Sequence, residues 1–152
     1  MARVVLLDAG PLGLACSRPG APRVDRCHAW LLHLEFSAAD IIIPAIADYE
    51  VRRELFRLGA RAKLRNLDLL KTRFDTLDIS RAALERAAEF WAALRNAGVP
   101  TAGPQDLDAD SILAGMAATA FDPSDIVTIA TTNVAHLGRF PGIDAREWST
   151  IT

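Results

Sequence analysis

The sequence predicts an α/β domain with a three-layer α/β/α architecture and a mostly parallel central sheet. Short apolar runs typical of buried strands alternate along the chain with longer segments of helical periodicity, the order expected when helices connect parallel strands. Hydrophobic residues make up 51% and charged residues 24% of the 152 residues, which is a globular composition. No internal repeat or linker interrupts the pattern, so we expect residues 1–152 to form a single domain.

The first half of the chain is expected to contain two strands and three helical segments. Residues 4–7 are β-branched or aliphatic without alternation, as in a strand buried on both faces, and residues 41–44 predict a second strand that ends at a proline. Residues 11–26 are rich in proline and glycine, which predicts a helix fragment and an irregular connection. Helical spacing covers residues 27–37 and residues 45–58.

The second half is expected to contain helices at 60–71, 81–96 and 108–120, a loop at 100–104, and strands at 74–79, 126–131 and 148–151. Ser80 is a good N-cap for the helix that follows it. The apolar face of that helix is expected to consist of Leu84, Ala87, Ala88, Trp91 and Leu94.

Charge and cysteine content exclude several classes of protein. The net charge of −2 does not indicate a nucleic-acid binder from bulk electrostatics. No apolar run approaches the ~20 residues of a membrane span and the N-terminus lacks a signal-type segment, so we expect a cytoplasmic protein that does not contact a membrane. Cys16 and Cys27 form neither a disulfide framework nor a metal-ligand spacing, so we expect reduced, partly buried thiols.

Basic residues are concentrated between positions 52 and 73, in contrast to the acidic balance of the whole chain. This stretch contains Arg52, Arg53, Arg57, Arg61, Lys63, Arg65, Lys71 and Arg73, against only Glu54 and Asp68. Such a stretch could follow a phosphate backbone, or it could be a solvated helix face that pairs with acids. The sequence leaves both interpretations open.

Three carboxylates lie at the border of buried surfaces on three separate elements. Asp8 follows the first strand directly, at the end where open α/β sheets bind ligands, although it could also simply cap the next helix. Glu50 flanks the apolar stripe of the helix at 45–58, and Asp110 continues the apolar row that includes Leu113 and Ala117. Capping explains one acid at the start of a helix, but not the group of Asp106, Asp108 and Asp110.

Converging carboxylates repel one another unless a cation lies between them. Hard oxygen ligands favour Mg²⁺ or Mn²⁺. Such an ion polarises a phosphodiester and supplies a hydroxide that attacks phosphorus. If the three acids meet, the sequence therefore predicts phosphoryl-transfer or hydrolase chemistry.

The chain resembles the PIN-domain family, the metal-dependent ribonucleases that include the VapC-type toxins. Four segments distributed over nearly the whole chain carry the resemblance, and a fifth resembles a common ending. They are Val4-Val5-Leu6-Leu7-Asp8-Ala9-Gly10-Pro11-Leu12, Ala47-Asp48-Tyr49-Glu50-Val51-Arg52-Arg53-Glu54-Leu55, Asp108-Ala109-Asp110-Ser111-Ile112-Leu113-Ala114, Ile129-Ala130-Thr131-Thr132-Asn133-Val134-Ala135-His136-Leu137 and Asp144-Ala145-Arg146-Glu147-Trp148. No single segment is specific, whereas the ordered set is fairly so.

The resemblance implies a PIN-like fold and an endoribonuclease that leaves a 5′-phosphate. It places Mg²⁺ or Mn²⁺ on Asp8, Glu50 and Asp110, with Asn133 as a further catalytic residue. Supporting roles fall to Asp108, which could act through a water, and to Thr131 and His136; the candidates for contact with the RNA backbone are Arg52, Arg53, Arg57 and Arg61. It also implies a homodimer and an antitoxin protein as partner.

The sequence departs from the family pattern at two places. Ala9 and Gly10 follow the first aspartate where many members have Ser or Thr. Asn133 and His136 stand where members carry an acid, which leaves Asp144 as a candidate substitute. A catalytically weakened PIN-like module that binds RNA or a protein is therefore the alternative function. A third hypothesis is a different acid-based phosphohydrolase, although the absence of an Asp-x-Asp pair at the first strand counts against the haloacid-dehalogenase type.

Overall fold

A parallel sheet of five strands forms the centre of the molecule. The structure is a computed structural model that describes residues 1–98 and 104–152, with only the backbone described for residues 104–106. The strands lie in the order β3-β2-β1-β4-β5 and each pairs in parallel with its neighbours. Their bounds are β1 Arg3–Leu7, β2 Asp40–Pro44, β3 Asp75–Leu77, β4 Ile126–Thr131 and β5 Asp144–Glu147. The predicted fold class is confirmed.

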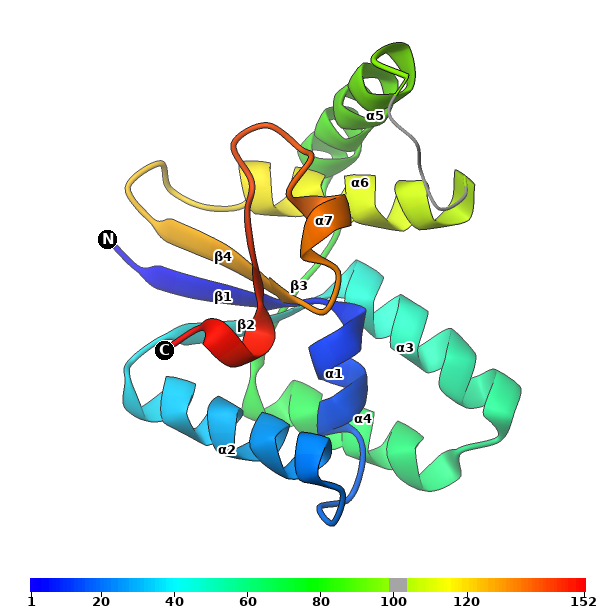
Figure 1. The fold of residues 1–152 in the computed structure, drawn as a ribbon, viewed down its shortest axis with the longest axis vertical. Coiled ribbons are helices and arrows are strands. Elements are labelled where there is room, and N and C mark those ends of the chain that lie inside the picture. The colour runs from blue at the N-terminus through cyan, green and yellow to red at the C-terminus, as the bar shows by residue number, and fades with distance from the viewer. Residues whose placement is uncertain (99–103) are drawn as a thin grey trace.

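Helices cover both faces of this sheet (Figure 1). Their bounds are α1 Ala9–Ala15, α2 Pro22–Phe36, α3 Ala45–Leu58, α4 Arg61–Arg73, α5 Arg81–Asn96, α6 Pro104–Thr119 and α7 Val134–Leu137, followed by the 3-10 turn Trp148–Thr150. Helices α2 and α4 lie below the sheet in Figure 1, whereas α5 and α6 lie above it. Helices α1 and α3 follow the carboxyl ends of β1 and β2.

Alternation along the strands divides the core into two clusters. Val5 and Leu7 pack with α1, α2 and α4 on one face, whereas Val4 and Leu6 pack with α5 and α6 on the other. All four β1 side chains are buried, as expected for a central parallel strand covered by helices on both faces. Because β1 lies between β2 and β4, the residue that follows it, Asp8, lies between the segments that follow these two strands.

Local chemistry sets several helix boundaries where the sequence predicts them. Helix α3 covers the predicted residues 45–58 and ends at Gly59, whose φ of 64° is a left-handed conformation that suits glycine. The Ser80 side chain accepts a hydrogen bond from the N–H of Ala83 at 3.0 Å and caps α5 as predicted. The predicted loop at 100–104 lies outside the described residues, except that α6 begins at Pro104.

Several element predictions need correction. The fifth strand is Asp144–Glu147, and the predicted strand at 148–151 begins instead with a 3-10 turn that buries Trp148. Helices α1 and α2 begin earlier than predicted, and the third strand shortens to Asp75–Leu77. Prolines at the first turn of α2 and within α1 do not prevent these helices, because the first-turn N–H groups have no helical partner.

The buried face of α5 is also rotated from the predicted one. Ala83, Ala87, Phe90 and Leu94 are buried, whereas Leu84 and Trp91 are exposed. The reason is a close crossing with α6: a Cβ on Gly115 would overlap the carbonyl oxygen of Ala83. The small Ala83 side chain therefore lies at the closest approach to α6, whereas Leu84 lies at the exposed margin of this helix pair.

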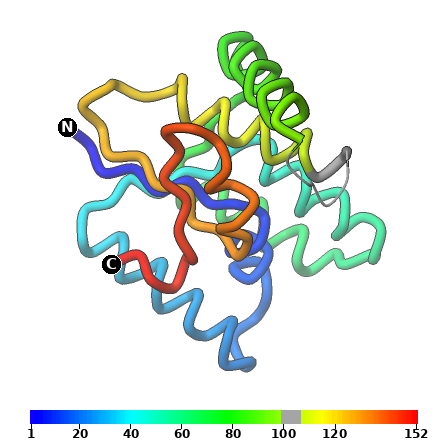
Figure 2. The backbone as a smooth tube through the Cα atoms, turned by 45° about the horizontal axis from the view of Figure 1, so that its top comes forward, coloured from blue at the N-terminus to red at the C-terminus, as the bar shows by residue number. Residues whose placement is uncertain are grey.

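The two termini and the two cysteines complete the fold. Arg3 donates a hydrogen bond to the carbonyl oxygen of Thr152, and Figure 2 shows both ends of the chain on the same side of the molecule. Cys16 and Cys27 are free and buried, as predicted, and burial raises the pKa of the first to about 12 and of the second to about 11. Within the described residues, no helix has the length and apolar character needed to cross a membrane.

Candidate functional site

Asp8 lies at the carboxyl end of the central strand and also caps the helix that follows. One carboxylate oxygen, Oδ1, accepts a hydrogen bond from the N–H of Ala9 at 2.8 Å. The other, Oδ2, accepts from the hydroxyl of Thr131 at 2.7 Å, across the β1–β4 pair. The two roles that the sequence left open, cap and member of a site, are therefore compatible, because the cap contact occupies only one of the two oxygens.

Burial determines the electrostatic state of Asp8. It raises the pKa of this carboxyl above its usual value, and the hydrogen bonds from Thr131 and from the Ala9 N–H oppose part of that rise. A partly buried carboxylate of this kind gains most from a nearby positive charge, because desolvation has weakened its stabilisation by water. The electrostatics of Asp8 therefore suit a cation ligand.

A chain of contacts leads from Asp8 to Asp110. The Thr131 hydroxyl that donates to Asp8 accepts a hydrogen bond from the N–H of Asn133 at 2.9 Å. The side-chain Nδ2 of Asn133 lies 2.8 Å from Nδ1 of His136, and this nitrogen lies 3.8 Å from Oδ2 of Asp110. Five of the sequence-predicted site residues are thus joined through the end of β4 and the segment after it: Asp8, Thr131, Asn133, His136 and Asp110.

Glu50 approaches the same end of the sheet from α3. It lines a hollow of about 390 Å³ together with Ala9, Gly10 and Arg53. Gly10 is needed there for a steric reason, since a Cβ at this position would lie 2.6 Å from Oγ1 of Thr132. The departure from the family pattern at Gly10 therefore has a local cause, the close approach of the segment after β4.

The three predicted metal ligands do not form a preformed metal site in this structure. Among residues 1–98 and 107–152, no group of three or more His, Cys, Asp or Glu side chains is close enough to hold a metal ion. The chemistry of the donors fits Mg²⁺ or Mn²⁺, because all three are carboxylates and Asp8 is partly buried. Their assignment as metal ligands stays a prediction.

Two further acids lie away from this chain of contacts. Asp108 lines a hollow between α3 and α6 and another between α5 and α6, so its predicted role through a water stays untested. Asp144 does not replace the missing acid: it pairs in register with Thr128 and bonds to the Thr128 hydroxyl at 3.0 Å. Thr128 lies three residues before Thr131, about 10 Å along the strand. The side chain of Asp106 lies outside the described residues.

The predicted RNA-contacting arginines differ in how far they are already paired. Arg52 bridges Asp48 on α3 and Asp68 on α4. Arg57 pairs with Glu54, and Arg53 lies 4.0 Å from Oε2 of Glu50. Arg61, at the start of α4, is exposed. Pairing with carboxylates reduces the charge that Arg52 and Arg57 offer to a phosphate backbone.

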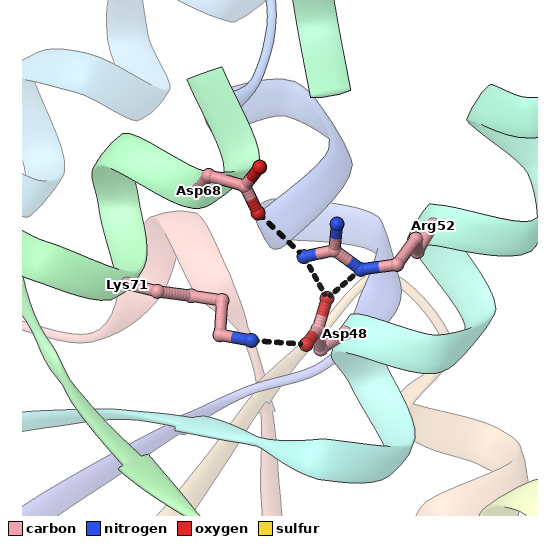
Figure 3. Close-up of polar contacts among 4 residues, drawn as sticks. All are labelled: Asp48, Arg52, Asp68 and Lys71. Atoms are coloured by element: carbon pink, nitrogen blue, oxygen red, sulfur yellow. Dashed lines mark hydrogen bonds and ion pairs between the residues drawn. The ribbon is translucent and has the colours of Figure 1, made fainter. Parts of the chain in front are cut away.

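The ion pairs of Arg52 belong to a four-residue network that joins α3 to α4 (Figure 3). Asp48 accepts from Arg52 Nε at 3.0 Å and from Lys71 Nζ at 2.8 Å. Asp48 precedes Glu50 by two residues, so the two side chains leave α3 on opposite sides. The network therefore holds the face of α3 that is turned away from Glu50. The i, i+4 spacing of Asp48 and Arg52 was the sequence signal that could have found it.

Comparison of this structure with solved structures identifies the fold. VapBC2 from Rickettsia felis, bound to a DNA fragment from its promoter, matches with a TM-score of 0.71 over 94% of this chain and 97% of that chain, at 18% identity. DNA-bound VapBC from Salmonella typhimurium matches with a TM-score of 0.66 over 97% and 99% of the two chains, at 22% identity. The chain has the PIN-like fold.

A toxin described as cleaving the sarcin-ricin loop shares this PIN-like fold. It is VapC20 from Mycobacterium tuberculosis, with a TM-score of 0.57 over 90% of this chain and 95% of that chain, at 16% identity. No family model and no curated protein matches the sequence. At these identities the likeness concerns the fold, so the activity has to be argued from the side chains described above.

Sequence reasoning missed one part of the PIN-like site region. Arg53 Cζ lies 5.2 Å from the centroid of the Tyr49 ring, one residue from Glu50. Tyr49 is exposed despite its size. The spacing of an aromatic and an arginine at i and i+4 could have indicated this contact, because such residues are neighbours on a helix.

Proposed function

We propose that the chain is a Mg²⁺- or Mn²⁺-dependent endoribonuclease, the toxin of a toxin–antitoxin pair, which acts in the cytoplasm. The observation that carries the proposal is the contact chain from the partly buried Asp8 carboxylate through Thr131, Asn133 and His136 to Asp110, at the carboxyl ends of the central strands. The PIN-like fold, shared with structures described as DNA-bound VapBC and as a sarcin-ricin loop cleaving toxin, supports the same function.

Asp8, Glu50 and Asp110 would hold the ion. When bound, a divalent ion polarises the phosphodiester and lowers the pKa of a water. Thr131 holds Asp8 in place by donating to Oδ2, so that its remaining lone pairs face the site. Asn133 and His136 orient each other through their 2.8 Å contact and can donate or accept hydrogen bonds at a phosphate or a water.

The partners belong to the same proposal. RNA is the substrate, an antitoxin segment covers the acidic site, and two copies of the chain form a homodimer. The likeness to structures described as DNA-bound VapBC, and to FitAcB from Neisseria gonorrhoeae, supports the pairing with an antitoxin. Coexpression with the product of a small neighbouring reading frame, followed by copurification, tests it.

One observation favours a second function, a weakened module that binds RNA or protein without cleavage. Asn133 and His136 contribute no fixed negative charge at the position where family members carry an acid, and Asp144 lies too far along the sheet to supply one. Retention of metal at three carboxylates would then be weaker than at four. A combined measurement of RNA cleavage and metal binding distinguishes the two functions.

The test combines cleavage with direct metal binding. Labelled structured RNA is incubated with wild type, Asp8→Asn and Asp110→Asn in Mg²⁺ or Mn²⁺, and Mn²⁺ affinity is measured by electron paramagnetic resonance. We expect cleavage by wild type, its loss in both variants, and weaker Mn²⁺ binding in both. Asp40→Asn is the matched control, because this exposed acid begins β2 and so lies at the amino ends of the strands, whereas Asp8 lies at their carboxyl ends.

Each outcome decides between the functions. Cleavage that survives both substitutions would overturn the site assignment. RNA binding without cleavage by wild type would establish the second function instead. Absence of both binding and cleavage on structured RNAs would overturn the proposal that RNA is the substrate.

A further inference from the structure

Tyr49, Arg53 and Asp108 surround a second hollow, between α3 and α6, that the contact chain of the site does not use. Its volume is about 350 Å³, and its remaining lining residues are Ile46, Ala109 and Ile112. The lining thus combines three aliphatic side chains with an aromatic ring, a guanidinium and a carboxylate, so it suits a flat ligand that has polar edges. A volume near the lower end of the range for ligand pockets suits one planar ring system better than a protein element.

The wall of this hollow offers a surface for stacking. Tyr49, which is 58% exposed, is the only tyrosine of the chain. Arg53 Cζ lies 5.2 Å from its ring centroid, so the aromatic ring and the guanidinium lie together. Proteins that bind single-stranded RNA use this pair of side-chain types, because every base has a face that can stack.

Arg53 also connects this hollow with the candidate site. It lines both hollows, and its Nη2 lies 4.0 Å from Oε2 of Glu50. A phosphate at the acidic site would thus have an adjacent base within reach of Tyr49. The half-exposed Arg53 guanidinium lies where it can neutralise the intervening phosphate.

Asp108 gives the hollow a preference among bases. A carboxylate accepts hydrogen bonds and cannot donate them when ionised, so it selects ring edges rich in N–H groups. The Watson–Crick edge of guanine carries an imino N–H and an amino group side by side, which suit the two oxygens of one carboxylate. Adenine and cytosine carry an amino group without a neighbouring imino N–H, and uracil has only its imino N–H.

We propose that the hollow bounded by Tyr49, Arg53 and Asp108 binds one unpaired base of the RNA, with guanine preferred. The inference rests on the proposed RNA substrate and specifies what the protein selects next to the scissile bond. Tyr49 stacks on the base, Arg53 pairs with the adjoining phosphate, and Asp108 accepts from the base edge.

Binding without cleavage tests the proposal. Wild type is titrated in EDTA against 5′-labelled uridine heptamers whose central nucleotide is guanosine, uridine or an abasic site, and fluorescence anisotropy reports the affinity. Gel analysis verifies that the oligomers stay intact. We expect guanosine to bind more tightly than uridine, and the abasic oligomer to bind least.

Substitutions assign the effect to individual side chains. Tyr49→Ala is expected to weaken guanosine-oligomer binding about 5- to 150-fold, the range for one stacked base, with little effect on the abasic oligomer, whereas Tyr49→Phe keeps the affinity. Asp108→Asn should reduce the preference for guanosine over uridine. Phe36→Ala removes an exposed aromatic from the end of α2 and is the matched control, expected to change nothing.

Equal losses for the guanosine and abasic oligomers, or unchanged affinity in Tyr49→Ala, would overturn the stacking role. A smaller molecular mass of Tyr49→Ala in solution would show instead that Tyr49 belongs to an interface between copies of the chain, and would also overturn it. If RNA cleavage persists while these binding results fail, the base pocket alone is wrong. If wild type binds none of the oligomers and cleaves no RNA, the proposed function falls with it.

Discussion

Replacing Thr131 by valine tests whether the hydroxyl at the end of β4 holds the candidate site together. Valine keeps the shape of threonine and removes only the hydroxyl. Thr131 is fully buried, so water cannot take the place of the lost group. The substitution removes the donor to Asp8 Oδ2 at 2.7 Å and the acceptor of the Asn133 N–H at 2.9 Å.

The expected loss of stability follows from these two hydrogen bonds. A bond to a charged group is worth about 1.5–3 kcal/mol and a neutral one about 1 kcal/mol, so we expect a total of about 2.5–4 kcal/mol. In a domain of this size each kcal/mol of destabilisation lowers the melting temperature by about 2–4 °C, so we expect a melting temperature about 5–15 °C lower than that of wild type. Urea unfolding monitored by tryptophan fluorescence measures the free energy directly.

Thr128→Val on the same strand is the matched control. Its hydroxyl donates to Asp144 Oδ2 at 3.0 Å, but Asp144 also pairs with Arg146 and reaches solvent, so it can recover the lost bond from water. We expect a loss of about 1 kcal/mol. Equal losses in the two variants, or a loss below about 0.5 kcal/mol in Thr131→Val, would refute the special role of Thr131.

Three further predictions concern packing, titration and charge. Gly115→Ala should destabilise the protein by about 1–3 kcal/mol because its Cβ meets the backbone of α5, whereas Gly13→Ala, which meets nothing within 4 Å, should stabilise it by about 0.5–1 kcal/mol, both measured by urea unfolding. Burial raises the pKa of the two cysteines to about 12 and about 11, so the folded state keeps both thiols protonated at a pH where the unfolded chain ionises them. The free energy of unfolding should therefore be unaffected by the thiols below pH 9 and should fall as the pH rises towards these values, by about 1 kcal/mol per thiol at pH 10. Replacing both cysteines with alanine should remove this alkaline loss. Asp48→Ala should cost about 1–3 kcal/mol because two cations lose their shared acceptor, whereas Glu54→Ala, which removes a solvent-exposed pair, should cost clearly less in the same assay.

The sequence predicted the strands of the sheet where composition alone determines burial. Residues 4–7 and 126–131 are continuous apolar or β-branched runs, and they form the two strands at the centre of the sheet. The edges were harder to predict. The fifth strand, Asp144–Glu147, is mostly polar because helices do not cover it completely, so hydrophobicity drew the prediction to Trp148 instead.

Packing between helices was likewise beyond the sequence pattern. Leu84 and Trp91 are more hydrophobic than Ala83 and lie on a plausible stripe, but at Ala83 and Ala87 the helix α5 lies too close to Gly115 of α6 for a large side chain. Close contact selects small residues, which carry little signal in a hydrophobic pattern. Partner choice was predictable only in part: the i, i+4 spacing indicates the Asp48–Arg52 pair, whereas nothing in the sequence indicates that Lys71 on α4 reaches the same carboxylate.

The residue types after β4 bear on how the site could bind both an ion and RNA. Three carboxylates around a divalent ion leave a net charge of −1, whereas a fourth acid would leave −2. Asn133 and His136 fill this position with a hydrogen-bonded pair 2.8 Å apart that adds no carboxylate. In the proposed nuclease this exchange would weaken retention of the cation, but it would also reduce repulsion of the phosphodiester, which is itself an anion. Asn133→Asp should therefore tighten Mn²⁺ binding and weaken RNA binding, two effects that a purely structural role of Asn133 would not produce.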